Sequence, residues 1–258
     1  MKPRSVTFVS FGETVASSRL RASIPQQQLE KIGVKRGLDV VVYGKHLVAF
    51  DQIKHFKNKV FDCCDDHFRT DRGDYYREHI AKADLVTCNS EKMAEIILVE
   101  TGRIATVIPD PYESEENPAG MGNGLLWFGH ESNLIDLHPY LDLKPEVLTG
   151  SDWSRDKQLA ALDKCAAVLI PTGKSMAKSA NRLIESVRNG RFVIAGHMPA
   201  HEEFKRMMWV GNIRDGVEWA KAYPHKAVGQ VKECQQYIRD KYSPEAIGRL
   251  WFNALGQL

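Results

Sequence analysis

The chain has 258 residues, of which 43% are hydrophobic and 26% are charged. This length is enough for one large core or two modest ones, and the composition is typical of a soluble globular protein. A formal net charge of +2 argues against a chain that binds polyanions through its whole surface. No apolar run approaches the roughly 18 residues that a membrane-spanning helix requires, so the sequence predicts no transmembrane segment.

The chain has five cysteines, an odd number, and none of them lies in a C-x-x-C spacing. A disulfide framework and a zinc site are therefore not expected. Free thiols fit a reducing compartment, which predicts a cytoplasmic protein. The first apolar run, residues 6–11, is too short for the core of a signal peptide and fits a β-strand instead.

The predicted strand at 6–11 opens the first α/β step. Gly12 follows it, and Ser17 or Ser18 caps a helix that extends to about residue 32. A strand, a glycine and a helix in this order form the phosphate-facing turn of a Rossmann-like unit, so Gly12 is a candidate phosphate contact. A plain turn is the alternative, because the G-x-G-x-x-G fingerprint is absent.

Short strands are predicted next at 38–43, 47–50 and 60–61. Polar residues follow the last of them, in the run Val-Phe-Asp-Cys-Cys-Asp-Asp-His-Phe that ends at residue 68. Ligands of open α/β sheets bind beyond the carboxyl ends of strands, which makes Asp66 and His67 candidate catalytic residues. The run could supply a general base for a substrate hydroxyl, a metal site, or a capped turn with solvated carboxylates. No D-x-D pair is present, which argues against the metal site.

Positive charge is concentrated between residues 31 and 59, where seven lysines and arginines stand against two aspartates. Such a stretch is either a solvated face or a surface that meets an anionic acceptor or a membrane. A DNA partner is a variant of the second interpretation, and it would show a steep dependence on salt.

The boundary between two sets of strands and helices falls in the middle of the chain. A strand from Ala83 and a helix capped by Asn89 or Ser90 belong to the end of the first set. Residues 113–124 are polar and rich in glycine, which is typical of a linker, and a new strand begins at Leu125.

Two successive sets of this kind predict two Rossmann-like α/β domains. We expect an N-terminal domain over residues 1–116 and a C-terminal domain over 121–242. A last helix within 243–258, with serine as cap and proline in the first turn, is expected to cross back to the N-terminal domain.

Residues 178–195 carry the most informative pattern of the second half. One face of a predicted helix is apolar, and Asn-Gly ends this helix before a buried strand. The opposite face begins with Lys178, Asn181, Arg182 and Glu185. The free N–H groups and the dipole of a helix N-terminus suit a phosphate, although Arg182 and Glu185 could also form a solvated ion pair.

Three stretches carry a resemblance to a known family. Lys-Ser-Ala-Asn-Arg-Leu-Ile-Glu-Ser at 178–186, with Asn-Gly-Arg-Phe-Val-Ile-Ala at 189–195, resembles the donor-site segment of GT-B glycosyltransferases of the retaining "glycosyl transferases group 1" class. Residues 83–112 resemble the end of that family's N-terminal domain, and residues 60–68 resemble a segment of its small members. The resemblance implies an α/β fold in which two Rossmann-like domains face each other across a cleft.

The resemblance also implies transfer of a sugar from a nucleotide-diphospho-sugar to an acceptor hydroxyl, with no metal or other cofactor. Glu185 matches the glutamate that binds the nucleotide ribose, and Lys178 and Arg182 would stabilise the departing diphosphate. The other candidate donor-binding residues are Gly12, Gly129, His130, Lys174, Ser179 and Asn181. The expected partners are a sugar nucleotide and a glycan or lipid acceptor, with a DNA acceptor and peripheral membrane contact as further options.

One position departs from the family pattern. The family has a second glutamate eight residues before the first, where this chain has Ala177. Retaining enzymes use that carboxylate on the donor sugar, so the sugar and the stereochemical outcome stay open. The segment around Lys174 also lacks the first glycine of a P-loop, which argues against ATP hydrolysis. Two rival functions remain: a sugar-nucleotide epimerase, and a nucleotide- or carbohydrate-binding protein without catalysis.

Overall fold

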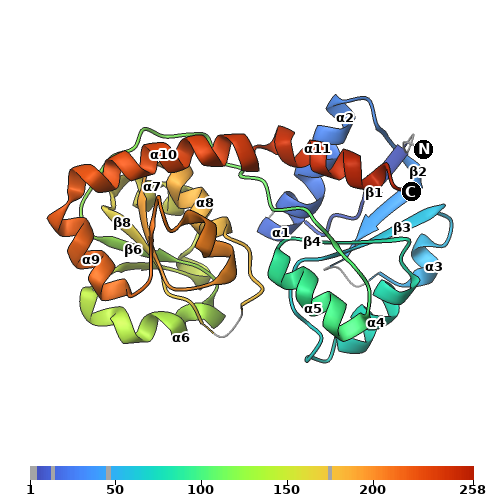
Figure 1. Cartoon of the computed structure of the whole chain (residues 1–258), viewed down its shortest axis with the longest axis horizontal. Helices are drawn as coiled ribbons and strands as arrows, with labels where there is room; N and C mark the ends of the chain where they lie inside the picture. The colour runs from blue at the N-terminus through green and yellow to red at the C-terminus, as the bar shows by residue number, and fades with distance from the viewer. Residues whose placement is uncertain (1–4, 13–14, 45–47, 174–175) are drawn as a thin grey trace. The chain divides into compact units, whose positions relative to one another are not determined.

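A computed structural model describes residues 5–12, 15–44, 48–173 and 176–258 of the chain. The chain divides into two compact units (Figure 1). Unit 1 consists of Met1–Pro111, Ala177–Ser179 and Lys241–Leu258, and unit 2 consists of Tyr112–Met176 and Ala180–Asp240. Each unit contains one parallel sheet of five strands with helices, which confirms the predicted fold class of two Rossmann-like α/β units.

The sheet of unit 1 has its five strands in chain order, and all neighbouring pairs are parallel. The strands are β1 (Ser5–Phe8), β2 (Lys35–Tyr43), β3 (Asn58–Cys63), β4 (Leu85–Cys88) and β5 (Thr106–Val107). Consecutive residues of β2 are buried although they point to opposite faces, as expected for a strand that is covered on both sides.

Helices cover both faces of this sheet. They are α1 (Ala16–Ser18), the π-helical turn η1 (Arg19–Ser23), α2 (Ile24–Lys31), α3 (Phe50–Ile53), α4 (Gly73–Lys82), α5 (Glu91–Thr101) and α11 (Pro244–Leu255). Tyr76 of α4 and Ile97 of α5 are buried in the core on one face. On the other face, Trp251 of α11 is fully buried and its ring meets that of Phe8 edge-on at a centroid distance of 5.0 Å.

Two local predictions for unit 1 can be compared directly with the structure. Ser90 caps α5 by accepting a hydrogen bond from the Met93 N–H, and Gly102 ends the helix at a φ of +70°, so the predicted cap and stop are confirmed. The predicted strand at 47–50 is wrong for the described residues, because Phe50 is the first residue of α3. Leu47 lies outside the described residues.

The sheet of unit 2 has the strand order β10-β9-β8-β6-β7, and all pairs are parallel. The strands are β6 (Leu125–Phe128), β7 (Glu146–Leu148), β8 (Ala167–Ile170), β9 (Phe192–Ala195) and β10 (Trp209–Val210). After β6 the chain forms β7, which pairs with one side of β6. The next strand in the chain, β8, pairs with the other side of β6. The crevice beyond the carboxyl ends of two such strands is where open α/β sheets bind their ligands.

The helices of unit 2 include one long segment that leads back to unit 1. They are α6 (Leu134–Leu137), α7 (Arg155–Lys164), α8 (Asn181–Arg188), α9 (Ile213–Ala222) and α10 (Pro224–Tyr242). Short 3-10 turns are η2 (Glu131–Asn133), η3 (His138–Leu143), η4 (Gly150–Asp152) and η5 (Pro199–Phe204). Helix α8 begins three residues later than predicted, at Asn181, and ends as predicted before Gly190, whose φ is +75°.

Residues 112–124, called the strap below, do not form the free linker that their composition predicts. The backbone N–H of Asn117 donates to the Arg188 carbonyl at 2.8 Å, and the N–H of Gly120 donates to the Gly190 carbonyl at 3.1 Å. Further along, the Asn123 N–H donates to the Lys164 carbonyl at 2.7 Å. The strap is therefore bound along unit 2. The first segment of unit 1 ends at Pro111, and unit 2 begins at Tyr112.

Among the described helices, none combines the length and the apolar character needed to cross a bilayer.

His79 of α4 is the centre of a buried aromatic cluster in unit 1. Its ring stacks against Phe50 and against Tyr75, with a centroid distance of 3.9 Å in each case. Its Nδ1 lies 3.1 Å from the Tyr43 hydroxyl. Burial lowers the pKa of His79 from 6.5 to about 4, so the folded protein holds this ring in its neutral form at physiological pH.

We expect this cluster to make the stability of unit 1 dependent on pH. In the unfolded chain His79 takes up a proton below pH ~6.5, whereas the folded chain resists protonation down to about pH 4. The contribution of neutral His79 to the free energy of unfolding is thus fully present near neutral pH, and it is lost as the pH falls from about 6.5 to about 4.

The His79→Phe variant keeps a ring but cannot titrate. Urea unfolding should show that its loss of stability between neutral pH and pH ~5 is smaller than that of the parent by about 1–2 kcal/mol. An equal pH dependence in the two proteins would contradict the assignment.

Candidate active site

The carboxyl ends of β6, β8 and β9 bring together the loops that begin at Gly129, Pro171 and Gly196 in unit 2. Two of these loops are packed too tightly for a larger residue. A Cβ atom at Gly196 would lie 2.4 Å from the Thr172 hydroxyl, and a Cβ at Gly173 would lie 2.1 Å from the Asp136 carboxylate. Close backbone contacts and Asp136, a residue that the sequence pattern did not single out, thus meet at this edge of the sheet.

Arg182 reaches this edge of the sheet from the first turn of α8. The apolar face of the helix is buried as predicted, through Ala180, Leu183, Ile184 and Val187. On the other side, the guanidinium of Arg182 donates a hydrogen bond of 3.2 Å to the Phe128 carbonyl, at the end of β6. It also lies over the Trp127 ring at 5.9 Å, and a Cβ at Gly129 would be 3.2 Å from it. Gly129 and Arg182, predicted separately from two segments, therefore lie together.

The charge of Arg182 has no direct counterion in the part of the chain that the structure describes. Burial lowers the pKa of its guanidinium, and the field of Asp136 acts in the opposite direction without forming an ion pair. A cation that is withdrawn from water and not neutralised by a carboxylate is unfavourable by itself. An anionic group bound at the end of β6 would remove this cost.

His201 of η5 is a second site residue that the sequence analysis missed. Its side chain is buried, and Nδ1 lies 3.0 Å from the Gly196 carbonyl, which can only accept a hydrogen bond. Burial lowers the pKa of His201, and the charge of Arg182 lowers it further. The hydrogen bond to the Gly196 carbonyl acts in the opposite direction, and the net effect favours the neutral ring beside Arg182. The only signal in the sequence is a histidine shortly after a buried strand.

Glu185 lies one turn further along α8 and contacts the strap. Its Oε1 accepts a hydrogen bond of 2.8 Å from the Glu113 N–H, and the side chain of Ser114 provides another. Burial raises the pKa of Glu185, and these two hydrogen bonds partly offset that effect. Glu185 is the residue predicted to bind the ribose. At least one of its carboxylate oxygens thus already accepts a hydrogen bond from within the protein.

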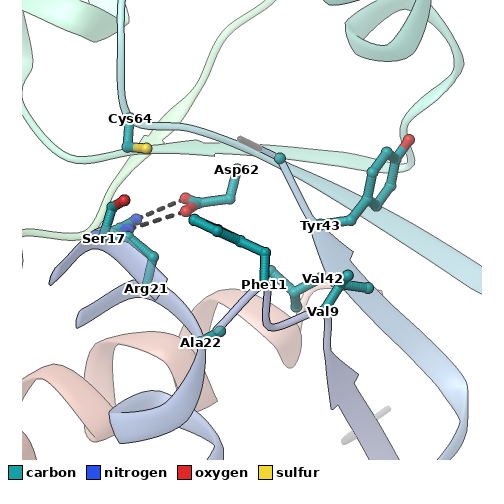
Figure 2. A pocket seen from close by; sticks show the side chains of 10 residues that line it. Val9, Phe11, Ser17, Arg21, Ala22, Val42, Tyr43, Asp62 and Cys64 are labelled. Carbon is teal, nitrogen blue, oxygen red and sulfur yellow. Dashed lines mark hydrogen bonds and ion pairs between the residues drawn. The ribbon is translucent and has the colours of Figure 1, made fainter. Parts of the chain in front are cut away.

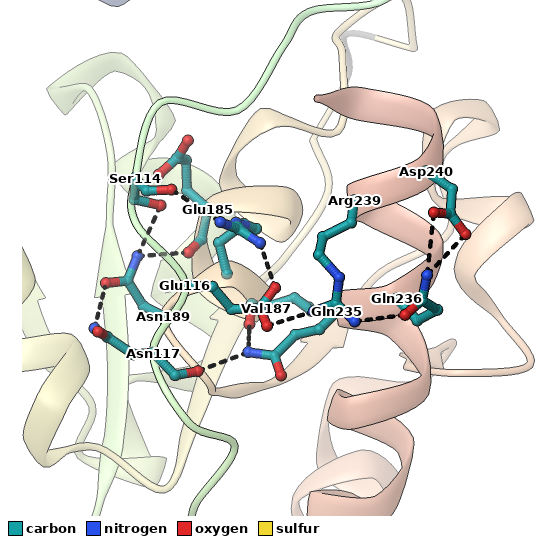
Figure 3. Close-up of polar contacts among 11 residues, drawn as sticks. Ser114, Glu116, Asn117, Glu185, Val187, Asn189, Gln235, Gln236, Arg239 and Asp240 are labelled. Atoms are coloured by element: carbon teal, nitrogen blue, oxygen red, sulfur yellow. Dashed lines mark hydrogen bonds and ion pairs between the residues drawn. The ribbon is translucent and has the colours of Figure 1, made fainter. Parts of the chain in front are cut away.

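A network of amide side chains fixes the strap between α8 and α10 (Figure 3). Asn189 donates to the Ser114 hydroxyl at 3.3 Å and to the Glu185 backbone carbonyl at 2.7 Å. From α10, Gln235 donates to the Asn117 carbonyl at 2.8 Å and to the Val187 carbonyl at 3.0 Å. The segment that contacts Glu185 is consequently held from two helices.

The other predicted donor-side residues are distributed over both units. His130 is exposed, and its Nδ1 accepts from the Ser132 N–H at 3.2 Å, so it caps η2. Asn181 is the first residue of α8. Lys178 and Ser179 are half-buried and belong by their contacts to unit 1. Gly12 is exposed with a φ of +119°, and Lys174 lies outside the described residues.

Unit 1 has a pocket at the carboxyl ends of its first three strands (Figure 2). Its cavity volume is about 20 Å³, which is room for roughly one water molecule. Its lining residues are Val9, Phe11, Ser17, Arg21, Ala22, Val42, Tyr43, Gly44, Asp62 and Cys64. A Cβ at Gly44 would lie 1.9 Å from the Asp62 carbonyl, so the ends of β2 and β3 can approach this closely only because residue 44 is glycine.

Arg21 and Asp62 form a buried ion pair in the wall of this pocket. The guanidinium donates to both carboxylate oxygens, at 2.9 and 2.6 Å (Figure 2). Arg21 also donates to Asp110 at 3.1 Å, and Thr87 donates to Asp62 at 2.7 Å. The nearby carboxylates favour the charged form, and the pKa of Arg21 stays above its ordinary value despite burial. In contrast to Arg182, this cation is fully neutralised within its own unit.

The predicted catalytic pair Asp66 and His67 does not line the pocket. Asp66 is exposed, and its Oδ1 accepts from the Phe68 N–H at 3.2 Å, which is the capped turn considered as an alternative. The His67 ring packs edge-on against Tyr76 at 5.2 Å. The structure instead brings Asp62, from the same sequence run, to the pocket wall. A catalytic role for Asp66 or His67 stays a prediction.

No cluster of three or more histidine, cysteine, aspartate or glutamate side chains suited to a metal ion occurs within the described ranges.

Comparisons with known proteins identify the fold. No family model and no curated protein sequence matches the chain. Among solved structures, HepE from Anabaena in complex with UDP-glucose is 11% identical, with a TM-score of 0.69 over 98% of this chain and 99% of HepE. TarM is 13% identical, with a TM-score of 0.60 over 84% of this chain and 54% of TarM. Sucrose-phosphate synthase from Thermosynechococcus elongatus is 10% identical, with a TM-score of 0.60 over 96% of this chain and 80% of that protein.

The matched proteins are GT-B glycosyltransferases, so the predicted GT-B fold is confirmed. The chain spans nearly the full length of HepE but only about half the length of TarM. At 10–14% identity the similarity concerns the fold alone.

The ion pair in the pocket wall gives a prediction for stability. The Arg21→Met variant should lower the free energy of unfolding of unit 1 by about 3–5 kcal/mol, because it leaves the Asp62 carboxylate buried without its cation. Adding Asp62→Asn to that variant should recover part of the loss. The matched control is Arg36→Met, which breaks the exposed pair with Glu30 and should cost less than about 1 kcal/mol. Equal losses for Arg21→Met and Arg36→Met in urea unfolding would be inconsistent with a neutralising role for Asp62.

Proposed function

We propose that the chain is a glycosyltransferase that moves a hexosyl group from a nucleotide-diphospho-sugar to an acceptor hydroxyl. The observation that carries the proposal is the position of Arg182, a partly buried cation without a direct counterion at the end of β6. This end adjoins β8 at the switch point of a parallel sheet, where such folds bind their ligands. The fold shared with HepE, solved with UDP-glucose, supports a sugar nucleotide as that ligand.

The chemistry follows from the charge that develops during transfer. The anomeric C–O bond breaks, its electron pair stays on the diphosphate oxygen, and the acceptor hydroxyl forms the new bond to the anomeric carbon and loses its proton. Arg182, Lys178 and the backbone N–H groups at the start of α8 would stabilise the departing diphosphate. Each preorganised donor of this kind typically contributes ~10²- to 10³-fold in rate. Transfer would then need no metal ion.

Ala177 limits what can be proposed about the sugar. This residue is 3% exposed, it is part of the apolar core of unit 1, and its carbonyl accepts from the Ser90 hydroxyl at 3.2 Å. A glutamate there would place a carboxylate in an apolar core, which is costly. Retention of configuration, which the resemblance implies, therefore has no support from this position. A binding protein without catalysis is the alternative that this observation favours.

Thermal stabilisation by a panel of sugar nucleotides tests the proposal. At least one nucleotide-diphospho-sugar should raise the Tm, because a ligand that binds only the folded state stabilises it. Arg182→Gln should weaken that ligand about 10-fold or more, since it removes the charge that faces the diphosphate. The matched control Arg214→Gln breaks an exposed pair with Asp142 and should leave the affinity unchanged. No stabilisation by any member of the panel would contradict the proposal.

Two variants of Glu185 separate its ligand role from its contact with the strap. Glu185→Gln keeps an oxygen that can accept from the Glu113 N–H, whereas Glu185→Ala removes it. A ribose ligand predicts weaker donor binding in both variants, with the Tm of the unliganded protein preserved only in Glu185→Gln. Unchanged donor affinity in a folded Glu185→Gln protein would argue that this residue serves the strap alone.

Product analysis distinguishes the rival functions. A transferase consumes donor only when a glycan, lipid or DNA acceptor is present, and Lys178→Ala should lower its turnover more than its donor affinity. An epimerase yields an isomerised sugar nucleotide from donor alone. Donor binding without any product would identify the binding protein that lacks catalysis.

A further inference from the structure

Arg188 lies on α8 one turn beyond Glu185, and it is buried, with 5% of its surface exposed. Its guanidinium contacts three residues of the strap. It donates to a carboxylate oxygen of Glu116 and, at 3.4 Å, to the Ser114 carbonyl, and it lies over the Tyr112 ring at 4.1 Å. These contacts fall on every second residue of the strap, so a single side chain fixes the beginning of this segment.

The same part of the strap binds Glu185. The Glu113 N–H, which lies between two of the residues that Arg188 contacts, donates to Oε1 of Glu185 at 2.8 Å. Because this donor belongs to the backbone, its direction depends on how the strap is held. Arg188 and Glu185 are three residues apart on α8, and residues with this spacing are neighbours on a helix surface. One segment of the strap can therefore contact both side chains.

Glu116 turns the contact between Arg188 and the strap into an ion pair. The Arg188 side chain is 6% exposed and that of Glu116 is 29% exposed. Arg239 of α10 donates to the other carboxylate oxygen of Glu116 (Figure 3). If the strap moved away, a buried guanidinium would lose its carboxylate, which is unfavourable. The ion pair thus holds the strap, and with it the Glu113 N–H, against α8.

We propose that Arg188 is a positioning residue for Glu185, which acts through the strap and holds the carboxylate ready to accept a hydrogen bond from the ribose of a nucleotide. The inference rests on the proposed function, in which Glu185 is the ribose ligand. A glutamate side chain that is fixed before binding loses less conformational freedom when the ligand arrives. The contact with the strap therefore raises the affinity for a ligand that carries a ribose.

Calorimetric titration of the full chain with uridine, adenosine and guanosine diphosphates tests the inference. Arg188→Lys keeps the positive charge beside Glu116, but a single ammonium group cannot make all three contacts with the strap. This variant should weaken the nucleoside diphosphate that binds best about 10-fold, because the carboxylate is no longer held for the ribose. Glu116→Gln removes the counterion instead, and it should change the affinity in the same direction by a smaller factor.

A double-mutant cycle distinguishes positioning from a general loss of structure. In a Glu185→Ala background the carboxylate is absent, so Arg188→Lys should change the affinity less than about 2-fold. The matched control is Arg191→Lys. Arg191 is another buried arginine of unit 2, and it donates to the carbonyl of Gly120, further along the strap, at 3.0 Å. The control should lower the Tm and leave the affinity for the nucleoside diphosphate unchanged.

Hydrogen exchange of the unliganded protein provides a measurement that needs no ligand. The peptide that contains the Glu113 amide should exchange faster in Arg188→Lys than in the parent, because the hydrogen bond to Glu185 opens more often. Arg191→Lys should leave the exchange of this peptide unchanged. Thermal melting of each variant confirms that the folded state is retained.

Two results would overturn the inference and leave the proposed function intact. One is an unchanged affinity for the nucleoside diphosphate in a folded Arg188→Lys protein. The other is an equal loss of affinity on Arg188→Lys in the parent and in the Glu185→Ala background. If none of the nucleoside diphosphates binds to the parent protein, the proposed function fails and the inference fails with it.

Discussion

A buried guanidinium needs negative charge nearby, and the two units of this protein meet that need differently. In unit 1, Arg21 is neutralised by Asp62 and Asp110, and its ring neighbour Trp251 belongs to the last helix. In unit 2, Arg182 has only a backbone carbonyl as a close partner and Asp136 at longer range. One cation holds elements of unit 1 together, whereas the other, under the proposed function, would meet the diphosphate of the donor. The assignment of structural and functional roles depends on this difference.

The strap changes how Glu185 should be interpreted. A glutamate on the polar face of a helix at a ligand-binding edge suggests a side chain that binds substrate and has no other role. Its contacts with Glu113 and Ser114 show that it also fixes a segment of the chain about seventy residues earlier. Asn189 and Gln235 hold the same segment from α8 and α10. Binding of a ribose at Glu185 would therefore act directly on the point where the strap begins.

Local features of the fold could be predicted from the sequence because they depend on nearby residues. The apolar stripe of α8, the serine cap of α5 and the glycines at helix ends follow from spacing of a few residues, and the structure has them all. The partners of Arg21 lie 41 and 89 residues away, and no local pattern indicates them. The strap was misjudged because its polar, glycine-rich composition describes a linker equally well. Its hydrogen bonds join it to backbone carbonyls and to side chains whose positions depend on the complete fold of unit 2.

The placement of α11 affects the order in which the protein can be completed during synthesis. Unit 1 needs residues from both sides of unit 2, since Trp251 fills the core beneath β1 and α2. Almost all of unit 2, in contrast, is encoded by one continuous interval. As the chain leaves the ribosome, part of the apolar face of the unit 1 sheet stays uncovered until unit 2 and then α11 have been translated. Protection of that face by a chaperone during this interval would reduce the aggregation to which such incomplete cores are prone.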